Sequence, residues 1–71
     1  MEVEVVIKIN DILHKEDISL RELSRRADVR HAALSELANG KRKRIEFDHI
    51  KRISEAMQIT DIREIIDIKT N

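Results

Sequence analysis

The chain of 71 residues has room for one small domain, and folding at this size buries only about 60% of the unfolded surface. It contains no cysteine, which excludes a disulfide framework or thiolate metal site and fits a reducing compartment. No apolar run approaches the roughly 20 residues of a membrane helix, and the N-terminus lacks the basic residues of a signal peptide. We therefore expect a cytoplasmic protein with no membrane partner, for which dimerisation is the most available source of extra stability.

The formal net charge is zero, but the charges are unevenly distributed along the chain. Residues 21–52 hold ten Lys or Arg and five acids, which gives +5, and the two flanks hold four bases and nine acids, which gives −5. A basic centre between acidic ends is typical of a chain that offers one face to a polyanion. Phe47 is the only aromatic residue, so folds that stack nucleic-acid bases on aromatic platforms are disfavoured.

The first elements of the chain are predicted by side-chain alternation and by a helix-capping signal. Residues 2–9, EVEVVIKI, alternate charged and β-branched side chains, which predicts a short strand, and helical spacing then predicts a helix from about Ile9 to Lys15. The tetrapeptide SLRE, which begins at Ser19, has the pattern of a capping box. In such a box the serine hydroxyl accepts an early backbone N–H while Glu22 reaches back to the serine N–H. A second helix is therefore expected after Ser19.

A third helix is predicted from about Arg30 to Asn39, separated from the second by a turn at Asp28. It ends at Asn39-Gly40, a dipeptide that is also a hairpin signal, but helical periodicity in the preceding ten residues favours a helix stop. The sequence KRKR follows; taken alone, it is also compatible with a solvated charge run or a nuclear-import signal. Two helices joined by so short a turn must cross steeply, which is the helix-turn-helix arrangement.

The rest of the chain predicts two more helices and a strand. A fourth helix should run from about Phe47 to Met57, and a fifth, capped by Thr60, should begin at Asp61. The last residues alternate again, and edge strands at the two ends of a small chain are natural partners, within one subunit or between two. The side chains of the fourth helix that are expected to face the core are Phe47, Ile50, Ile53 and Met57.

The run ISLRELSRRADVRHAALSELANGKRKRI, followed by FDHIKRISEAMQI, resembles the lambda-repressor-like DNA-binding domain of the Xre, or Cro and CI, type. The resemblance covers about residues 9–66 and implies an all-α, five-helix fold whose short terminal β-strands can pair. The chain is then a single helix-turn-helix domain over residues 1–71. Its expected parts are an N-terminal strand in residues 1–8, a helical core in 9–65 and a C-terminal strand or tail in 66–71. The positions that match the family's core are Leu23, Ala27, Val29, Leu34 and Leu37.

The resemblance also implies a function, that of a small phage or bacterial repressor-type regulator of transcription. Such a protein binds double-stranded DNA with its third helix in the major groove and its next loop on the phosphates. We expect a homodimer, with the terminal strands as the interface. The residues expected to read bases are His31, Ala32, Ser35 and Glu36. The residues expected to meet phosphates are Ser19, Arg30, Asn39, Gly40, Lys41, Arg42, Lys43 and Arg44.

The chain departs from the family at three places. Leu20 stands where the second helix often begins with Gln, and Asp28 stands where the turn usually has Gly. The third helix has alanines at 32 and 33 and lacks the long amides and arginines that form bidentate base contacts. The neutral total charge and this weak set of base readers leave a second function open, a helix-turn-helix interaction module that regulates a partner protein without strong DNA binding. RNA binding is a third alternative.

Catalysis and metal binding have no support in the sequence. The three histidines, at 14, 31 and 49, share no ligand spacing, and no cysteine stands near them. No nucleophile, acid and base can be assembled into one constellation, and a chain this small offers little cleft. We therefore expect no enzymatic activity, no cofactor and no bound metal.

Overall fold

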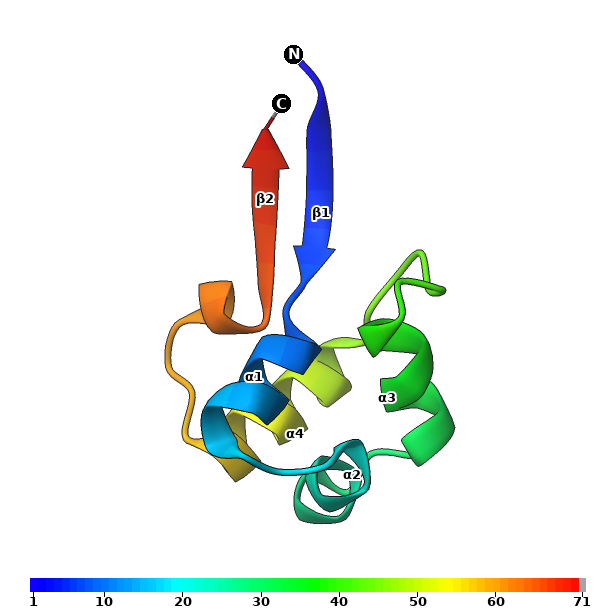
Figure 1. The fold of residues 1–71 in the computed structure, drawn as a ribbon, viewed down its shortest axis with the longest axis vertical. Coiled ribbons are helices and arrows are strands. Elements are labelled where there is room, and N and C mark those ends of the chain that lie inside the picture. The colour runs from blue at the N-terminus through cyan, green and yellow to red at the C-terminus, as the bar shows by residue number, and fades with distance from the viewer. Residues whose placement is uncertain (71) are drawn as a thin grey trace.

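In the computed structural model, which describes residues 1–70, four α-helices form a body from which two paired strands project (Figure 1). The ribbon of strands accounts for the elongated shape, which measures 38 × 23 × 22 Å. No helix in this part of the chain is long and apolar enough to cross a membrane. In chain order the elements are β1 (Val3–Ile7), α1 (Ile9–Glu16), α2 (Leu20–Ala27), α3 (His31–Ala38), α4 (Phe47–Met57), the 3-10 helix η1 (Ile62–Glu64) and β2 (Ile66–Thr70).

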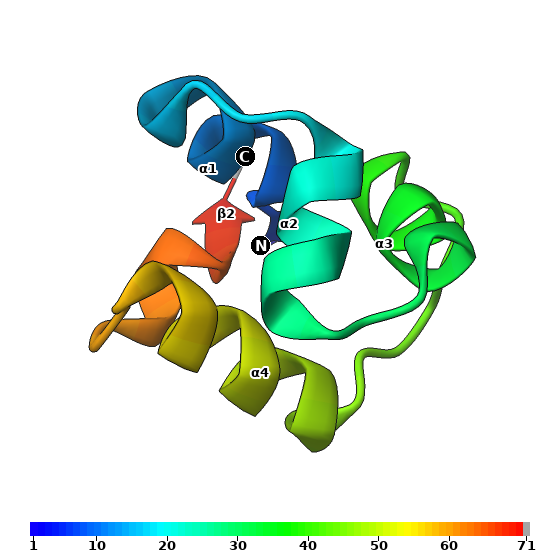
Figure 2. The ribbon, with the colours of Figure 1, turned by 90° about the horizontal axis from the view of Figure 1, so that it is seen from below.

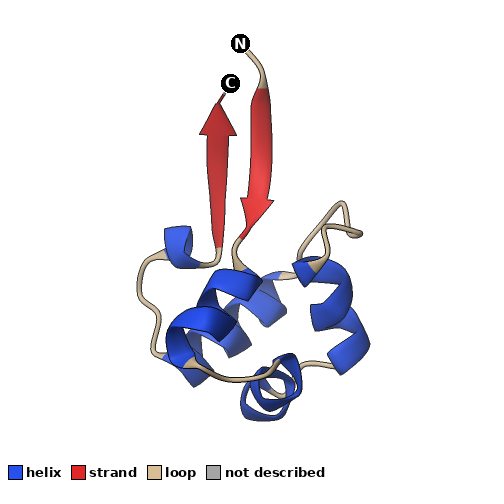
Figure 3. Cartoon of the chain, viewed as in Figure 1, coloured by secondary structure: helices blue, strands red, loops and turns tan. Residues whose placement is uncertain are grey.

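The two terminal strands form an antiparallel two-stranded sheet (Figure 3). All five residues of each strand are paired, beginning with Val3 opposite Thr70. The ladder continues toward the helices, because the Lys8 N–H donates to the Ile65 carbonyl over 2.7 Å. The predicted pairing of the two ends is thus confirmed, and it takes place within one chain.

The predicted helical fold with paired terminal strands is confirmed in part, but the prediction of a fifth helix is wrong. After α4 the described chain forms only one 3-10 turn, η1, and then passes directly into β2. The turn is capped by Asp61 and not by Thr60, since the Asp61 carboxylate accepts the Arg63 N–H over 2.9 Å. Only four residues separate Asp61 from the start of β2 at Ile66, which is too short for an α-helix of several turns. The domain is mostly helical, and the part that the structure describes has four α-helices and one two-stranded antiparallel sheet.

The hydrophobic core lies among the helices and beneath the ribbon. Figure 2 shows α2 between α3 and α4, the two helices against which it packs. The five core positions implied by the family resemblance are all buried, which confirms them. Each fully buried leucine or isoleucine contributes roughly 1.5–3 kcal/mol. Within residues 1–70 the buried apolar residues are Ile9, Ile12, Leu23, Ala27, Val29, Ala33, Leu34, Leu37, Ile53 and Ile65.

The prediction that Phe47 faces the core is wrong, because this residue is 89% exposed. Phe47 is the first residue of α4, and side chains on a helix lean toward its N-terminus. At the first position the side chain therefore extends past the end of the helix, beyond the reach of the core. The buried side of α4 is formed by Ile53, with Ile50 and Met57 half-buried.

The predicted capping box of α2 is half formed. The Ser19 hydroxyl accepts the Glu22 N–H over 3.1 Å, as expected. The Glu22 carboxylate does not turn back to Ser19; it binds Arg25 over 2.6 Å and Arg26 over 2.8 Å. Hydrogen bonds from these two guanidinium groups, Arg25 first, lower the pKa of Glu22 from its ordinary 4.5 to about 2. Charged donors compete better for a carboxylate than the neutral N–H of the cap does.

Candidate nucleic-acid interface

The turn between α2 and α3 is held by hydrogen bonds from α2 and from α4. Asp28 adopts the left-handed conformation, with φ 54°, at the position where the family usually has glycine. The Val29 N–H donates to the Ser24 carbonyl over 3.2 Å, and the Ser24 hydroxyl donates to the Val29 carbonyl. From α4, Arg52 donates to the Asp28 carbonyl over 2.7 Å and to its carboxylate over 3.2 Å. These bonds fix the angle at which α3 leaves α2.

The sequence alone does not point to a role for Arg52. Arg52 also pairs with Asp48 one turn earlier in α4, over 2.9 Å. The partner in the turn lies 24 positions away in the chain, so no local pattern could reveal it. Arg52 acts as a brace of the helix-turn-helix, because it ties the turn to the helix on the other side of α2.

Gly40 terminates α3, which confirms the predicted helix stop. It has φ 69°, a conformation that glycine adopts without steric cost. The Gly40 N–H donates to the Leu37 carbonyl over 3.2 Å and the Lys41 N–H donates to the Glu36 carbonyl over 2.9 Å, the two bonds of a Schellman motif. A Cβ at position 40 would meet nothing within 4 Å. Backbone conformation, and not crowding within the chain, therefore explains the glycine.

One side of α3 is buried and the other is open. Ala33, Leu34 and Leu37 face the core. The opposite side, which we call the α3 face, carries the four residues predicted to read bases. Ala32 and Glu36 are exposed there, while His31 and Ser35 are half-buried. Just beyond the helix, the exposed Asn39 amide donates to the Ser35 hydroxyl over 3.4 Å. The α3 face is thus small and mostly uncharged, with Glu36 as its one anionic group.

The basic loop, residues 41–44, follows directly after Gly40. Lys41, Lys43 and Arg44 are exposed and make no ion pair within residues 1–70. Arg42 differs from them, because it is half-buried and its Nε lies 3.7 Å from the Glu36 carboxylate. The loop therefore presents three unpaired cations, and its fourth cation offsets the charge of the α3 face.

The two remaining phosphate-contact candidates lie at helix starts. Arg30 occupies the N-cap of α3, is exposed and has no ion-pair partner in the described part of the chain. Ser19 lies at the start of α2, and its hydroxyl is already occupied as the cap of that helix. The chain thus has unpaired cations at both ends of α3, with Arg30 at the start and the basic loop after the end. Among residues 1–70 no group of three or more His, Cys, Asp or Glu could hold a metal ion.

A braced turn between two short helices, an open face on the second helix and unpaired cations at its ends together define a helix-turn-helix DNA-binding domain. A family model of the Cro/C1-type HTH DNA-binding domain matches residues 8–71, and the chain belongs to this family. The resemblance seen in the sequence is thereby confirmed. The family is one of DNA-binding regulators of transcription and not of enzymes, and DNA is the partner that it implies. Searches of curated proteins and of solved structures returned no match.

Proposed function

We propose that this Cro/C1-type protein is a sequence-specific, repressor-type regulator of transcription. It inserts α3 into the major groove of DNA and binds the phosphates with the basic loop. The observation that carries the proposal is the position of Lys41, Lys43 and Arg44. They follow the open face of α3 directly and have no carboxylate partner in the described chain. Unpaired cations release counterions when they neutralise phosphates, and this release drives protein–DNA association.

The phosphate contacts would set the position of α3 on the duplex. Arg30 and the three unpaired cations of the basic loop are the main anchors in this proposal, because they can move to a phosphate without breaking an ion pair. Arg42 is a weaker anchor because its Nε is already close to Glu36. Asn39 and Gly40 would contribute polar groups at the end of α3. Ser19 would contribute only if its hydroxyl binds a phosphate while it also caps α2.

The α3 face would make the base contacts, and its chemistry limits how many there are. Ala32 can contact a thymine methyl group, His31 can hydrogen-bond a purine N7, and Ser35 can bond either a base or a phosphate. Glu36 can accept from a cytosine amino group, and the nearby Arg42 reduces its repulsion of phosphates. No bidentate reader of guanine or adenine is present on this face, so one domain should discriminate weakly.

Weak discrimination by one domain favours a homodimer on two half-sites, and we propose that the terminal ribbon joins the two copies. One face of the ribbon is apolar and open, with Val3, Val5 and Ile68 respectively 51%, 61% and 65% exposed. Val5 lies opposite Ile68 in the sheet, so these side chains form one continuous patch. Packing two such patches about a two-fold axis would remove apolar surface from water and place two α3 helices on one operator.

The experiment that tests the proposal is a gel shift with random genomic fragments at low salt, followed by selection of bound sequences from a random duplex library. The proposal predicts retention in the first step and a two-fold symmetric motif in the second. A protein that retains no fragment at low salt would contradict it. That result would favour the second function, an interaction module without strong DNA binding. The neutral net charge and the small side chains of the α3 face are consistent with such a module.

A further inference from the structure

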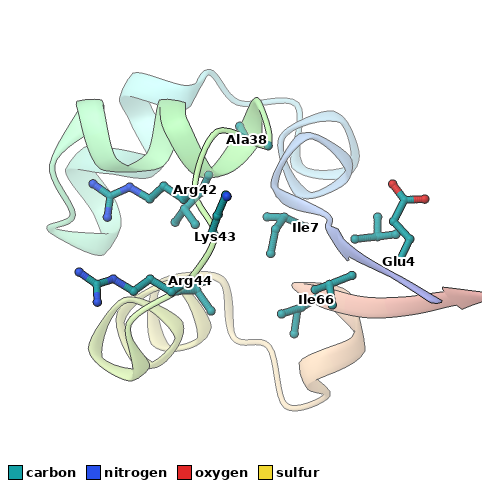
Figure 4. Close-up of a pocket in the computed structure, with 12 residues that line it drawn as sticks. Glu4, Ile7, Ala38, Arg42, Lys43, Arg44 and Ile66 are labelled. Carbon is teal, nitrogen blue, oxygen red and sulfur yellow. The ribbon is translucent and has the colours of Figure 1, made fainter. Parts of the chain in front are cut away.

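A groove of about 620 Å³ runs between β1 and the basic loop (Figure 4). Its size is in the range of pockets that hold ligands. Figure 4 shows Lys43 on the loop side of the groove and Glu4 at the other end, with Ile7 and Ile66 between them. The apolar residues that line it are Val5, Val6, Ile7, Leu37, Ala38, Ile45 and Ile66. The groove therefore combines an apolar lining with a cation at one end and an anion at the other.

The wall formed by β1 is a free strand edge. The Lys8 N–H bonds to the Ile65 carbonyl, so this pair is hydrogen-bonded. Hydrogen-bonded and non-bonded pairs alternate in an antiparallel ladder, which assigns Val6 and Glu4 to bonds with β2. The backbone N–H and C=O groups of Val3, Val5 and Ile7 then point away from β2. Figure 1 shows β1 between β2 and the basic loop, so this free edge lies on the side of the groove.

We propose that the groove binds an extended peptide of a partner protein, which adds as a third strand to β1 and is acidic at the end nearest Lys43. Free edge groups supply the backbone bonds of such strand addition, and pockets beside the edge select alternate side chains. Carboxylates complement Lys43, whereas the end beside Glu4 requires uncharged or basic residues. In an antiparallel arrangement the acidic end is the N-terminal half of the peptide.

The occupant is a single strand and not β1 of a second copy. In a second copy, β1 carries β2 on its own outer edge. A strand seated in the groove has the basic loop on that side, where residues 42–45 line the groove. If the occupant were β1 of a second copy, the β2 of that copy would lie about 4.8 Å farther from the groove's own β1, in the space that the basic loop already occupies.

This site would regulate DNA binding, and that consequence rests on the proposed function. Lys43 lines the groove and is also a proposed phosphate contact. A carboxylate that pairs with Lys43 removes a cation from the DNA-binding surface. Bound peptide and bound DNA therefore exclude each other, and the partner protein acts as an antagonist of the regulator.

The test uses a fluorescein-labelled peptide, Glu-Val-Glu-Val-Thr-Val-Thr, and a matched peptide with both glutamates replaced by glutamine. Fluorescence anisotropy with the whole chain should show saturable binding of the acidic peptide and at least tenfold weaker binding of the neutral one. Lys43→Ala should weaken the acidic peptide by about tenfold and leave the neutral one unchanged, whereas the control Lys69→Ala on β2 should change neither. Equal binding of the two peptides by the wild type would overturn the proposal.

The strand edge is tested by proline, which is tolerated at edge positions whose N–H is not bonded within the sheet. Val5→Pro should abolish peptide binding. Thr70→Pro on β2 is its control and should leave peptide binding unchanged, because Thr70 lies opposite Val3 in a pair that is not hydrogen-bonded across the sheet. Since Val5→Pro can fail to fold, the amide NMR signals of Val3, Val5 and Ile7 in the wild type give a second measurement. They should shift on peptide addition, and unchanged signals would overturn the proposal.

The proposed DNA-binding function and the proposed peptide site can be contradicted separately. Peptide binding that persists undiminished when a duplex that the chain retains is added in excess would contradict the shared role of Lys43, but not the DNA-binding function. Peptide binding by a chain that retains no DNA would contradict the proposed function and leave the groove assignment intact.

Discussion

The α3 face and the basic loop are consecutive in the chain, yet they differ in what they offer to DNA. The α3 face carries small side chains and one carboxylate, on a helix whose other side is anchored by Ala33, Leu34 and Leu37. The basic loop carries four cations in sequence, and three of them have no ion-pair partner in the described chain. Affinity should therefore come mainly from the loop and specificity from a few weak contacts of the helix.

Leu34→Ala should have the largest effect, because it removes the support that both regions share. Leu34 is fully buried, and a leucine-to-alanine change at such a site costs about 2–5 kcal/mol. Small domains have only about 5–15 kcal/mol of stability in total. We expect a large drop in the melting temperature by circular dichroism and a matching loss of DNA binding.

Ser35→Ala is the control for Leu34→Ala, since it changes the same helix on its half-buried, outer side. Its effect on the free energy of unfolding should stay within about 0.5 kcal/mol. If the Leu34→Ala variant has the melting temperature of the wild type, α3 is not anchored in the core through Leu34 as described.

Glu36→Gln separates specificity from affinity. Loss of the carboxylate removes repulsion from phosphate, so affinity for unrelated duplexes should rise. At the base pair that Glu36 contacts, discrimination should fall by an amount within the roughly 1–3 kcal/mol of a good base contact. Selection from a random duplex library with wild type and variant would reveal both effects. Identical selected motifs would show that Glu36 does not read a base.

Asp28→Gly should raise stability slightly, by less than about 1 kcal/mol. Glycine adopts the observed φ of 54° without steric cost. The substitution also removes the carboxylate contact with Arg52, but the Asp28 side chain is 95% exposed and such pairs contribute little. The bond from Arg52 to the Asp28 carbonyl is retained.

Asp17→Gly provides a matched comparison for Asp28→Gly. Asp17 ends α1 with the same φ of 54° and makes no ion pair within residues 1–70. Its gain in the free energy of unfolding, measured in urea, should therefore exceed that of Asp28→Gly. A larger gain at Asp28 would mean that the Arg52 pair strains the turn.

The smallest effect concerns acid stability. The pKa of Glu22 is lowered to about 2 by Arg25 and Arg26, and that of Asp61 is lowered to about 2 by Arg63. A carboxylate whose pKa is lower in the folded state stabilises the fold above its ordinary pKa and loses this contribution as pH falls through the folded value. The melting temperature should therefore decrease from about pH 4.5 to pH 2. Glu22→Gln should make the decrease in melting temperature with pH less steep. An unchanged decrease would contradict the ion pairs of Glu22 with Arg25 and Arg26.

Much of the helix-turn-helix could be predicted because its signals are local. The Ser19 cap, the helical spacing of Leu34 and Leu37 and the stop at Asn39-Gly40 all act within one or two helical turns. The pairing of the terminal strands could also be predicted, because each strand alternates and neither has another partner nearby in the chain.

The remaining features depend on contacts that no local pattern specifies. The Arg52 brace and the Glu36–Arg42 pair join side chains from different elements. Phe47 had the spacing of a core residue, but its place at the start of α4 decided its exposure. The segment after Asp61 has helical spacing, yet the start of β2 limits it to one turn. The groove beside β1 exists only because strand pairing brings the N-terminus close to the basic loop.

The most direct test of the central claim is the dependence of DNA affinity on salt concentration for the wild type, the double variant Lys43→Ala/Arg44→Ala and the control Lys69→Ala. If the basic loop grips phosphates, the slope of log affinity against log salt should become shallower by about 2 in the double variant, roughly 0.9 for each phosphate that is no longer neutralised. Affinity should fall to a similar degree on all sequences, while Lys69→Ala keeps the wild-type slope. Equal slopes for the wild type and the double variant would contradict the claim.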